Sequence, residues 1–133
     1  MRLVLDTNKL YTFFWKGSLI KKLLSAEHKL YSPEFAITEL DKHKSEILKK
    51  SELSSKEFEE LKLRLKKFIK IVPFSEYSKQ ISKALSLIPQ HPKDVDFLAL
   101  ALELNASIIS EDKELKKQSE IKVFNKSEFS ELF

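Results

Sequence analysis

The stretch Arg2-Leu3-Val4-Leu5-Asp6-Thr7-Asn8 constrains the fold of this chain more than any other. Three consecutive apolar residues here predict a strand buried on both faces, as in a parallel sheet. Asp6 follows that strand at once. Ligands of open α/β sheets bind beyond the carboxyl ends of the strands, so Asp6 is a candidate functional acid. The alternative is that Asp6 caps the next helix or begins a turn.

The composition excludes several kinds of site. The 133 residues fit a single domain, 1–133, and contain no cysteine, which excludes disulfides, thiolate metal sites and thiol nucleophiles. The only glycine is Gly17, whereas a dinucleotide fingerprint, a P-loop or a nucleophile elbow needs at least two. The three histidines match no metal-binding spacing, so any bound metal is expected to have oxygen ligands.

Net charge and hydropathy indicate which partners and which cellular location to expect. The net charge of +4 permits a polyanionic partner without requiring one. No apolar run approaches the ~20 residues of a membrane helix, and the amino terminus lacks the features of a signal peptide. We therefore expect a cytoplasmic protein with no membrane association.

The first half of the chain alternates helical and extended patterns. The spacing predicts two short helices between Lys9 and Leu24 that meet at Gly17, then a strand at residues 29–31. Ser32-Pro33 predicts a helix start, and that helix is expected to run from Pro33 to about Lys50. Glu39 lies at the edge of its apolar stripe, where the simplest alternative to a functional role is a surface pair with Lys42.

The middle of the chain continues this alternation. Ser54-Ser55-Lys56-Glu57 has the form of a capping box and predicts a helix to about Ile69. Ile69–Val72 predicts a strand ended by Pro73, and a further helix is expected from Ser75 to Ile88.

The last part of the chain supplies three more acids. Asp94 and Asp96 open a helix that is apolar nearly all round and that Asn105 is expected to end. Either acid could instead cap that helix, which is worth about 1 kcal/mol. Residues 106–110 predict a buried strand that leads into Glu111-Asp112. The chain closes with a strand at 121–124 and a helix whose Phe129, Leu132 and Phe133 are expected to pack on the core.

Alternating strands and helices predict an α/β fold: a three-layer α/β/α sandwich with a parallel sheet of four or five strands. In that fold Asp6, Glu39, Asp94 and Asp112 can converge at one carboxyl edge. Gathered carboxylates repel one another unless a cation binds between them. Mg²⁺ and Mn²⁺ prefer oxygen ligands and commonly accompany substrate phosphates, so the pattern favours phosphodiester hydrolysis.

Four motifs in this order resemble the PIN domain nucleases, which include the VapC toxins of prokaryotic toxin and antitoxin pairs. They are residues 3–8, Thr38-Glu39-Leu40, residues 94–101 and Ser110-Glu111-Asp112-Lys113. The resemblance covers nearly the whole chain. It implies an endoribonuclease dependent on Mg²⁺ or Mn²⁺, often a homodimer, with RNA as substrate and an antitoxin protein as a partner.

The resemblance also assigns roles to individual residues. Asp6, Glu39, Asp94 and Asp112 would be the catalytic and metal-binding acids, with Asp96 as an accessory ligand or a cap. Asn8 and Ser110 would support the carboxylates through hydrogen bonds. Glu111 departs from the usual pattern, and on an extended strand its side chain should point away from Asp112.

Two other functions fit parts of the sequence. One is a nucleic-acid binding or assembly module that keeps the fold without catalysis. The other is a phosphatase of the haloacid dehalogenase type, which also has an aspartate after its first strand. That chemistry normally needs a second aspartate two residues later, and this chain has Asn8 there.

Overall fold

The fold is organised around a five-stranded parallel sheet, as the sequence predicts. The computed structural model describes residues 1–11, 14 and 28–131. The sheet has the order β3-β2-β1-β4-β5, with every neighbouring pair parallel. Its strands are β1 (Arg2–Leu5), β2 (Lys29–Pro33), β3 (Ile69–Val72), β4 (Ser107–Ile109) and β5 (Val123–Phe124).

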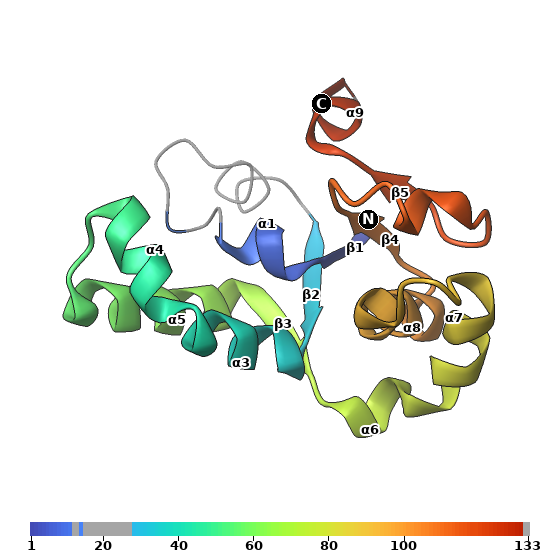
Figure 1. Cartoon of the computed structure of the whole chain (residues 1–133), viewed down its shortest axis with the longest axis horizontal. Helices are drawn as coiled ribbons and strands as arrows, with labels where there is room; N and C mark the ends of the chain where they lie inside the picture. The colour runs from blue at the N-terminus through green and yellow to red at the C-terminus, as the bar shows by residue number, and fades with distance from the viewer. Residues whose placement is uncertain (12–13, 15–27, 132–133) are drawn as a thin grey trace.

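Helices cover both faces of this sheet, which gives the predicted three-layer sandwich (Figure 1). One side carries α1 (Thr7–Tyr11), α3 (Glu34–Lys42), α4 (Lys44–Ser51) and α5 (Ser55–Phe68). The other carries α6 (Phe74–Tyr77), α7 (Ile81–Leu87) and α8 (Val95–Leu104), and α8 packs on β1, β2 and β4. Short 3-10 helices lie at Ser78–Gln80, Pro92–Asp94 and Leu115–Lys117, and α9 (Lys126–Glu131) follows β5.

The chain changes direction across the sheet between β1 and β4. It goes from β1 outward to β2 and β3, then returns through α6, α7 and α8 to β4 on the opposite side of β1. Parallel α/β sheets bind ligands at such a topological switch point, beyond the carboxyl ends of the strands. The register pairs Leu5 with Ile109 there, so the residues that follow both strands are neighbours.

Burial explains why these segments form the centre of the molecule. Leu3, Val4 and Leu5 are fully buried, as expected for a central strand covered on both faces. In α8, Leu98, Ala99, Leu100 and Ala101 are also fully buried. The helix ends at Asn105, whose left-handed conformation (φ 51°, ψ 49°) caps it as predicted.

The structure corrects the predicted start of the helix after β2. Ser32 was expected to be its N-cap, but β2 continues through Pro33, which pairs with Val72. The Ser32 hydroxyl donates to the Leu5 carbonyl at 2.9 Å instead. Sheet pairing therefore outweighs the local capping preference, and the helix begins at Glu34 with Pro33 as its cap.

Two long predicted helices are each divided. The helix expected from Pro33 to Lys50 breaks at His43, whose backbone (φ −103°, ψ 18°) separates α3 from α4. The helix expected from Ser75 to Ile88 becomes α6, a 3-10 turn and α7, a path along which both α6 and α7 contact α8. The capping box at Ser54 and Glu57 forms as predicted.

Some expectations fall outside the described residues. Beyond the end of α1, the two short helices expected between Lys9 and Leu24 lie outside the described residues. Leu132 and Phe133 lie outside them as well. Phe129 of α9 is buried on the core, as expected. No helix of the described segments is long and apolar enough to cross a membrane.

Candidate active site

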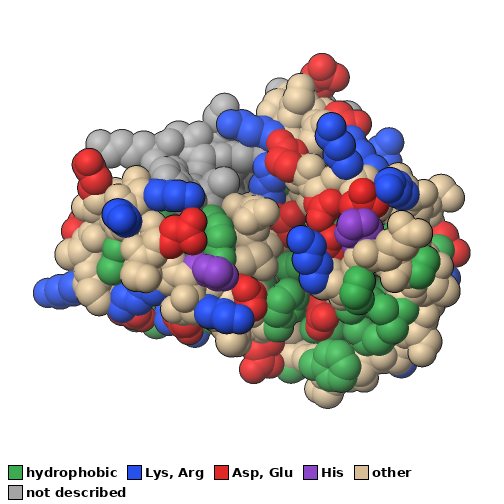
Figure 2. Space-filling view, in the orientation of Figure 1, with side chains coloured by type: hydrophobic (Ala, Val, Ile, Leu, Met, Phe, Trp, Pro, Cys, Tyr) green, Lys and Arg blue, Asp and Glu red, His purple; other side chains and the backbone are tan. Residues whose placement is uncertain are grey.

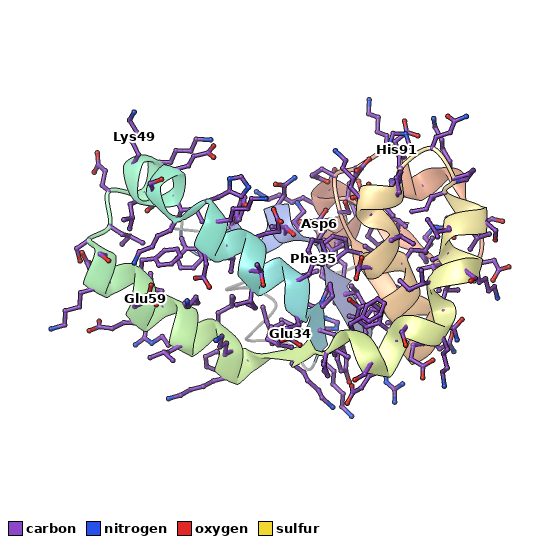
Figure 3. The ribbon with its side chains drawn as sticks, turned by 60° about the horizontal axis from the view of Figure 1, so that its bottom comes forward. Asp6, Glu34, Phe35, Lys49, Glu59 and His91 are labelled. Carbon is purple, nitrogen blue, oxygen red and sulfur yellow. The ribbon has the colours of Figure 1, made fainter. Side chains whose placement is uncertain are left out.

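Three of the candidate acids lie together at the switch point of the sheet. Asp6 follows β1, Asp112 lies three residues beyond the end of β4, and Asp94 directly precedes α8. All three line one cavity of about 460 Å³. Figure 3 shows Asp6 in the middle of the molecule, between the α3–α5 side and the α7–α8 side.

Asp6 is held by hydrogen bonds that serve two purposes. Only 7% of the residue is exposed, and one carboxylate oxygen accepts from the Lys9 backbone N–H at 2.9 Å, which caps α1. The other oxygen accepts from the Ser110 hydroxyl. Burial raises the pKa of Asp6 above its ordinary value, although the Ser110 and Lys9 hydrogen bonds oppose that rise. The capping role therefore holds, and it leaves the carboxylate in the cavity.

Ser110 connects Asp6 with Asp112. Its hydroxyl donates to Asp6, and the same oxygen accepts from the Asp112 backbone N–H at 3.0 Å. Asp112 Oδ1 also accepts from the Glu114 backbone N–H at 2.9 Å. A buried serine thus fixes the spacing of two carboxylates from different segments.

Asp94 and Asp112 form a closely coupled pair of carboxyl groups. Burial, followed by the hydrogen bond and the charge of Asp112, raises the pKa of Asp94 to about 7. The same hydrogen bond holds the pKa of Asp112 below its ordinary value. Two carboxylates in contact cannot both ionise without cost, which is why the pKa of Asp94 rises while that of Asp112 falls.

The pair has the chemistry expected of a cation site. Asp94 Oδ2 is buried and receives no hydrogen bond from any described donor. Asp94 also occupies the cap position of α8 without forming a side-chain cap bond, so capping does not account for it. Clustered carboxylate oxygens, one of which receives no hydrogen bond from the described residues, suit Mg²⁺ or Mn²⁺ as hard oxygen ligands.

The acids are not arranged as a finished metal site. Within residues 1–11, 14 and 28–131, no group of three or more histidine, aspartate or glutamate side chains is close enough to hold an ion. The residues fit a divalent cation by their chemistry, and binding would have to draw them closer together.

Glu39 lies in the same cavity but has a different partner. Its carboxylate is 3.5 Å from His43 Nε2, one helical turn later, and not paired with Lys42 as the surface alternative supposed. His43 also lies 3.7 Å from Glu46. Glu39 and His43 therefore line the cavity together.

The other candidate residues are placed as follows. Asp96 accepts from the Tyr77 hydroxyl at 2.5 Å and is not among the cavity residues, so its contact is with α6. Glu111 pairs with Lys9 at 3.5 Å, and its side chain lies away from the cavity. Asn8 lines the cavity with an exposed side chain.

The rest of the cavity wall was not predicted from the sequence. It comprises Thr7, Tyr11, Phe35, His43, Glu46, Lys93 and Phe97. The i, i+4 spacing of Glu39 and His43 was the available signal for one of them. The aromatic residues belong to the core pattern, and only the tertiary structure brings their edges to the cavity. Figure 2 shows acidic side chains near the middle of this face, with a histidine to either side.

Comparisons with known proteins agree with this architecture. The PIN domain family model matches residues 4–128. Among curated proteins, none has a sequence that matches this chain significantly.

Solved structures with the same fold include two from VapBC complexes. A chain of VapBC2 from Rickettsia felis, bound to a DNA fragment from its promoter, aligns with a TM-score of 0.68 and 18% identity, over 94% of this chain and 98% of that one. A chain of VapBC-1 from nontypeable Haemophilus influenzae aligns with a TM-score of 0.65 at the same identity and coverage.

Proposed function

Because the chain belongs to the PIN domain family, we propose that it is an endoribonuclease that hydrolyses RNA phosphodiester bonds with Mg²⁺ or Mn²⁺. The observation that carries this proposal is the cluster of Asp6, Asp94 and Asp112 at the switch point, with one buried carboxylate oxygen left without a donor.

We assign the cation to the three clustered acids, with Glu39 as the fourth carboxylate of the cavity. These residues would hold a divalent cation, which would supply activation of a water for attack on phosphorus and neutralisation of the charge on the leaving oxygen. Ser110 holds Asp6 and the Asp112 backbone in position. A bound cation would favour the ionised form of Asp94, whose raised pKa otherwise favours the protonated form.

The basic residues of the cavity have a complementary task. Lys93 lies on the cavity wall beside Asp94, and its charge lowers the pKa of both Asp94 and Asp112. An ammonium group at the mouth of an acidic cavity attracts the phosphate backbone that the carboxylates alone would repel. His43 places a second basic group on the other part of the wall.

The biological context is inferred from the relatives. Both structural neighbours belong to VapBC complexes, and we infer that this chain is the toxin of a toxin and antitoxin pair, with an antitoxin protein as partner. A homodimer and a cytoplasmic site of action, where RNA substrates are present, belong to the same proposal. An RNA-processing role would use the same acids.

One observation favours a second candidate, a catalytically silent module for nucleic-acid binding or assembly. That observation is the absence, in the described part of the chain, of a preformed group of three metal-binding side chains. The silent module would bind RNA without cleaving it.

Cleavage of a fluorescently labelled RNA by wild type, Asp6→Asn and Asp96→Asn proteins distinguishes these functions. Asp96 is a matched control, since it is an acid near the same α8 start that contacts Tyr77 and not the cavity. We expect Mg²⁺- or Mn²⁺-dependent cleavage by wild type and Asp96→Asn, and loss of cleavage in Asp6→Asn. Equal rates in wild type and Asp6→Asn would reject the proposed site, and no cleavage by a folded, RNA-binding wild type would favour the silent module.

A further inference from the structure

A second cavity lies at the opposite edge of the sheet from the acids. It has a volume of about 470 Å³ and shares no described lining residue with the acidic cavity. Its residues come from the amino end of β2, the end of α5 and the start of β3, which adjoin where Leu30 pairs with Ile69 (Figure 1). The five residues of β2 separate the two edges by roughly 15 Å.

The wall of this cavity is strongly basic. Lys29, Lys66, Lys67 and Lys70 all line it, all are exposed, and no described residue of the wall is acidic. None of the four forms an ion pair with a described residue. Elsewhere on α4 and α5, by contrast, Lys44, Lys50 and Lys62 each pair with a carboxylate.

Such a concentration of unpaired charge needs an explanation. Lys66 and Lys67 lie in the last turn of α5, where a positive charge is favourable to the helix dipole. That explanation does not extend to Lys29 and Lys70, which lie on strands. Four like charges around one cavity attract an anion with several charges along its length.

Aromatic side chains interleave with these lysines. Phe68 follows Lys67 directly and is 53% exposed, although it ends a helix whose other face is buried. Tyr31 contributes a second, partly exposed ring to the same wall. The side chains of Asp and Glu in an acidic peptide have no flat rings to stack on such a surface, whereas the unstacked bases of a single strand do.

We propose that this cavity, lined by Lys29, Tyr31, Lys66, Lys67, Phe68 and Lys70, binds single-stranded nucleic acid, with the lysines on the phosphates and Phe68 stacked on a base. The site is separate from the acids and requires no metal ion. A strand can be bound there without being cleaved. Binding at this cavity can therefore be tested independently of the proposed nuclease activity.

The test measures binding of fluorescein-labelled oligo(U) RNA of about twenty nucleotides by anisotropy, in EDTA, at several salt concentrations. The key variant is Lys29→Glu/Lys70→Glu, which leaves Lys66 and Lys67, whose charges favour the α5 dipole, unchanged. The matched control is Lys49→Glu/Lys56→Glu, which makes the same change of net charge at exposed positions on α4 and α5. Figure 3 shows Lys49 at the far end of α4.

We expect the key variant to bind at least about tenfold more weakly. The slope of log affinity against log salt concentration should decrease in magnitude by roughly one to one and a half. The control should change affinity less than about threefold. Phe68→Leu keeps an apolar side chain but removes the ring, and should weaken binding about tenfold. A duplex of the same length should bind more weakly than the single strand.

Three results would overturn the proposal. They are an equal loss in the key and control variants, an unchanged affinity in Phe68→Leu, or competition by polyglutamate as effective as by oligo(U) of equal charge. The last result would assign the surface to an acidic protein segment. Lys29→Gln/Lys70→Gln, checked by thermal unfolding, repeats the test if the charge-reversed protein is unstable, with an expected loss of about threefold or more.

Discussion

The two edges of the sheet differ in how their charges are tolerated. At the carboxyl edge, Asp6, Asp94 and Asp112 are partly or fully buried; the pKa of Asp94 is raised, and Ser110 donates a hydrogen bond to Asp6. At the amino edge, Lys29, Lys66, Lys67 and Lys70 are exposed to water, which screens them. Buried like charges require a counter-ion at a defined place, whereas exposed ones only attract a polyanion. The first edge is therefore suited to chemistry and the second to binding.

The largest expected effect is on RNA cleavage, and it should distinguish Asp94 from the nearby Asp96. Asp94→Asn should lower the RNA cleavage rate by about 100-fold or more, because it removes a carboxylate of the proposed cation site. Asp96→Asn should leave that rate within about twofold, since the amide oxygen still accepts from Tyr77. Single-turnover cleavage assays measure both. Similar losses in the two variants would remove the distinction between cavity and surface acids.

Ser110→Ala tests the role of the hydroxyl that connects Asp6 with Asp112. The variant removes the Ser110 donor from one oxygen of buried Asp6, which keeps its bond from the Lys9 backbone N–H, and frees the Asp112 backbone N–H. Residues that support ligands in this way typically change activity or metal affinity by 10- to 100-fold. We expect a loss of that order in cleavage, while Ser110→Thr, which keeps the hydroxyl, should recover part of it. Full activity in Ser110→Ala would show that Asp6 needs no such support.

The raised pKa of Asp94 makes the metal-free protein sensitive to pH. The folded state holds this proton more tightly than the unfolded chain, so its stabilising contribution is full below about pH 4 and is lost as the pH rises through about 7. In EDTA, Asp94→Asn should therefore gain stability relative to wild type between pH 5 and pH 8. Solvent reaches part of the side chain and Asp112 titrates in the opposite sense, so we expect a gain of about 1–2 kcal/mol.

Urea unfolding of the two proteins at both pH values measures that gain. A difference that does not change with pH would contradict the raised pKa of Asp94.

The smallest expected effect is at the amino edge. Lys29→Gln/Lys70→Gln removes two of four neighbouring like charges and should stabilise the metal-free protein by a few tenths of a kcal/mol at low salt. The gain should vanish in 1 M salt, because the Debye screening length is then about 3 Å. Thermal unfolding at two salt concentrations measures it. A salt-independent change would indicate that packing, and not charge, is altered.

The sequence predicted the parts of the fold that local pattern and burial determine together. The buried strand before Asp6, the apolar helix after Asp94 and the capping box at Ser54 each combine a periodic pattern with a clear boundary. The prediction failed at Ser32-Pro33, where pairing with β3 outweighed a good helix start. It also missed the break at His43 within one continuous helical pattern.

The candidate site was predictable in its acids more than in its surroundings. Parallel strands bring their carboxyl ends to one edge, so Asp6 and Asp112 could be placed by topology alone. Periodicity alone does not distinguish Asp94, which lines the cavity, from Asp96, which contacts Tyr77; the family resemblance favoured Asp94 as the site acid. The pairing of Glu39 with His43 and the aromatic part of the wall depend on side-chain positions that topology leaves open.

Calorimetric titration of the protein with Mn²⁺ tests the central claim most directly. Asp112→Asn and Glu111→Gln alter adjacent acids, of which the first lines the cavity and the second pairs with Lys9. We expect saturable Mn²⁺ binding by wild type and Glu111→Gln, accompanied by proton release near pH 6, and little or no binding by Asp112→Asn. Binding that is equal in the two variants, or absent from folded wild-type protein, would contradict the assignment of a divalent-cation site to these acids.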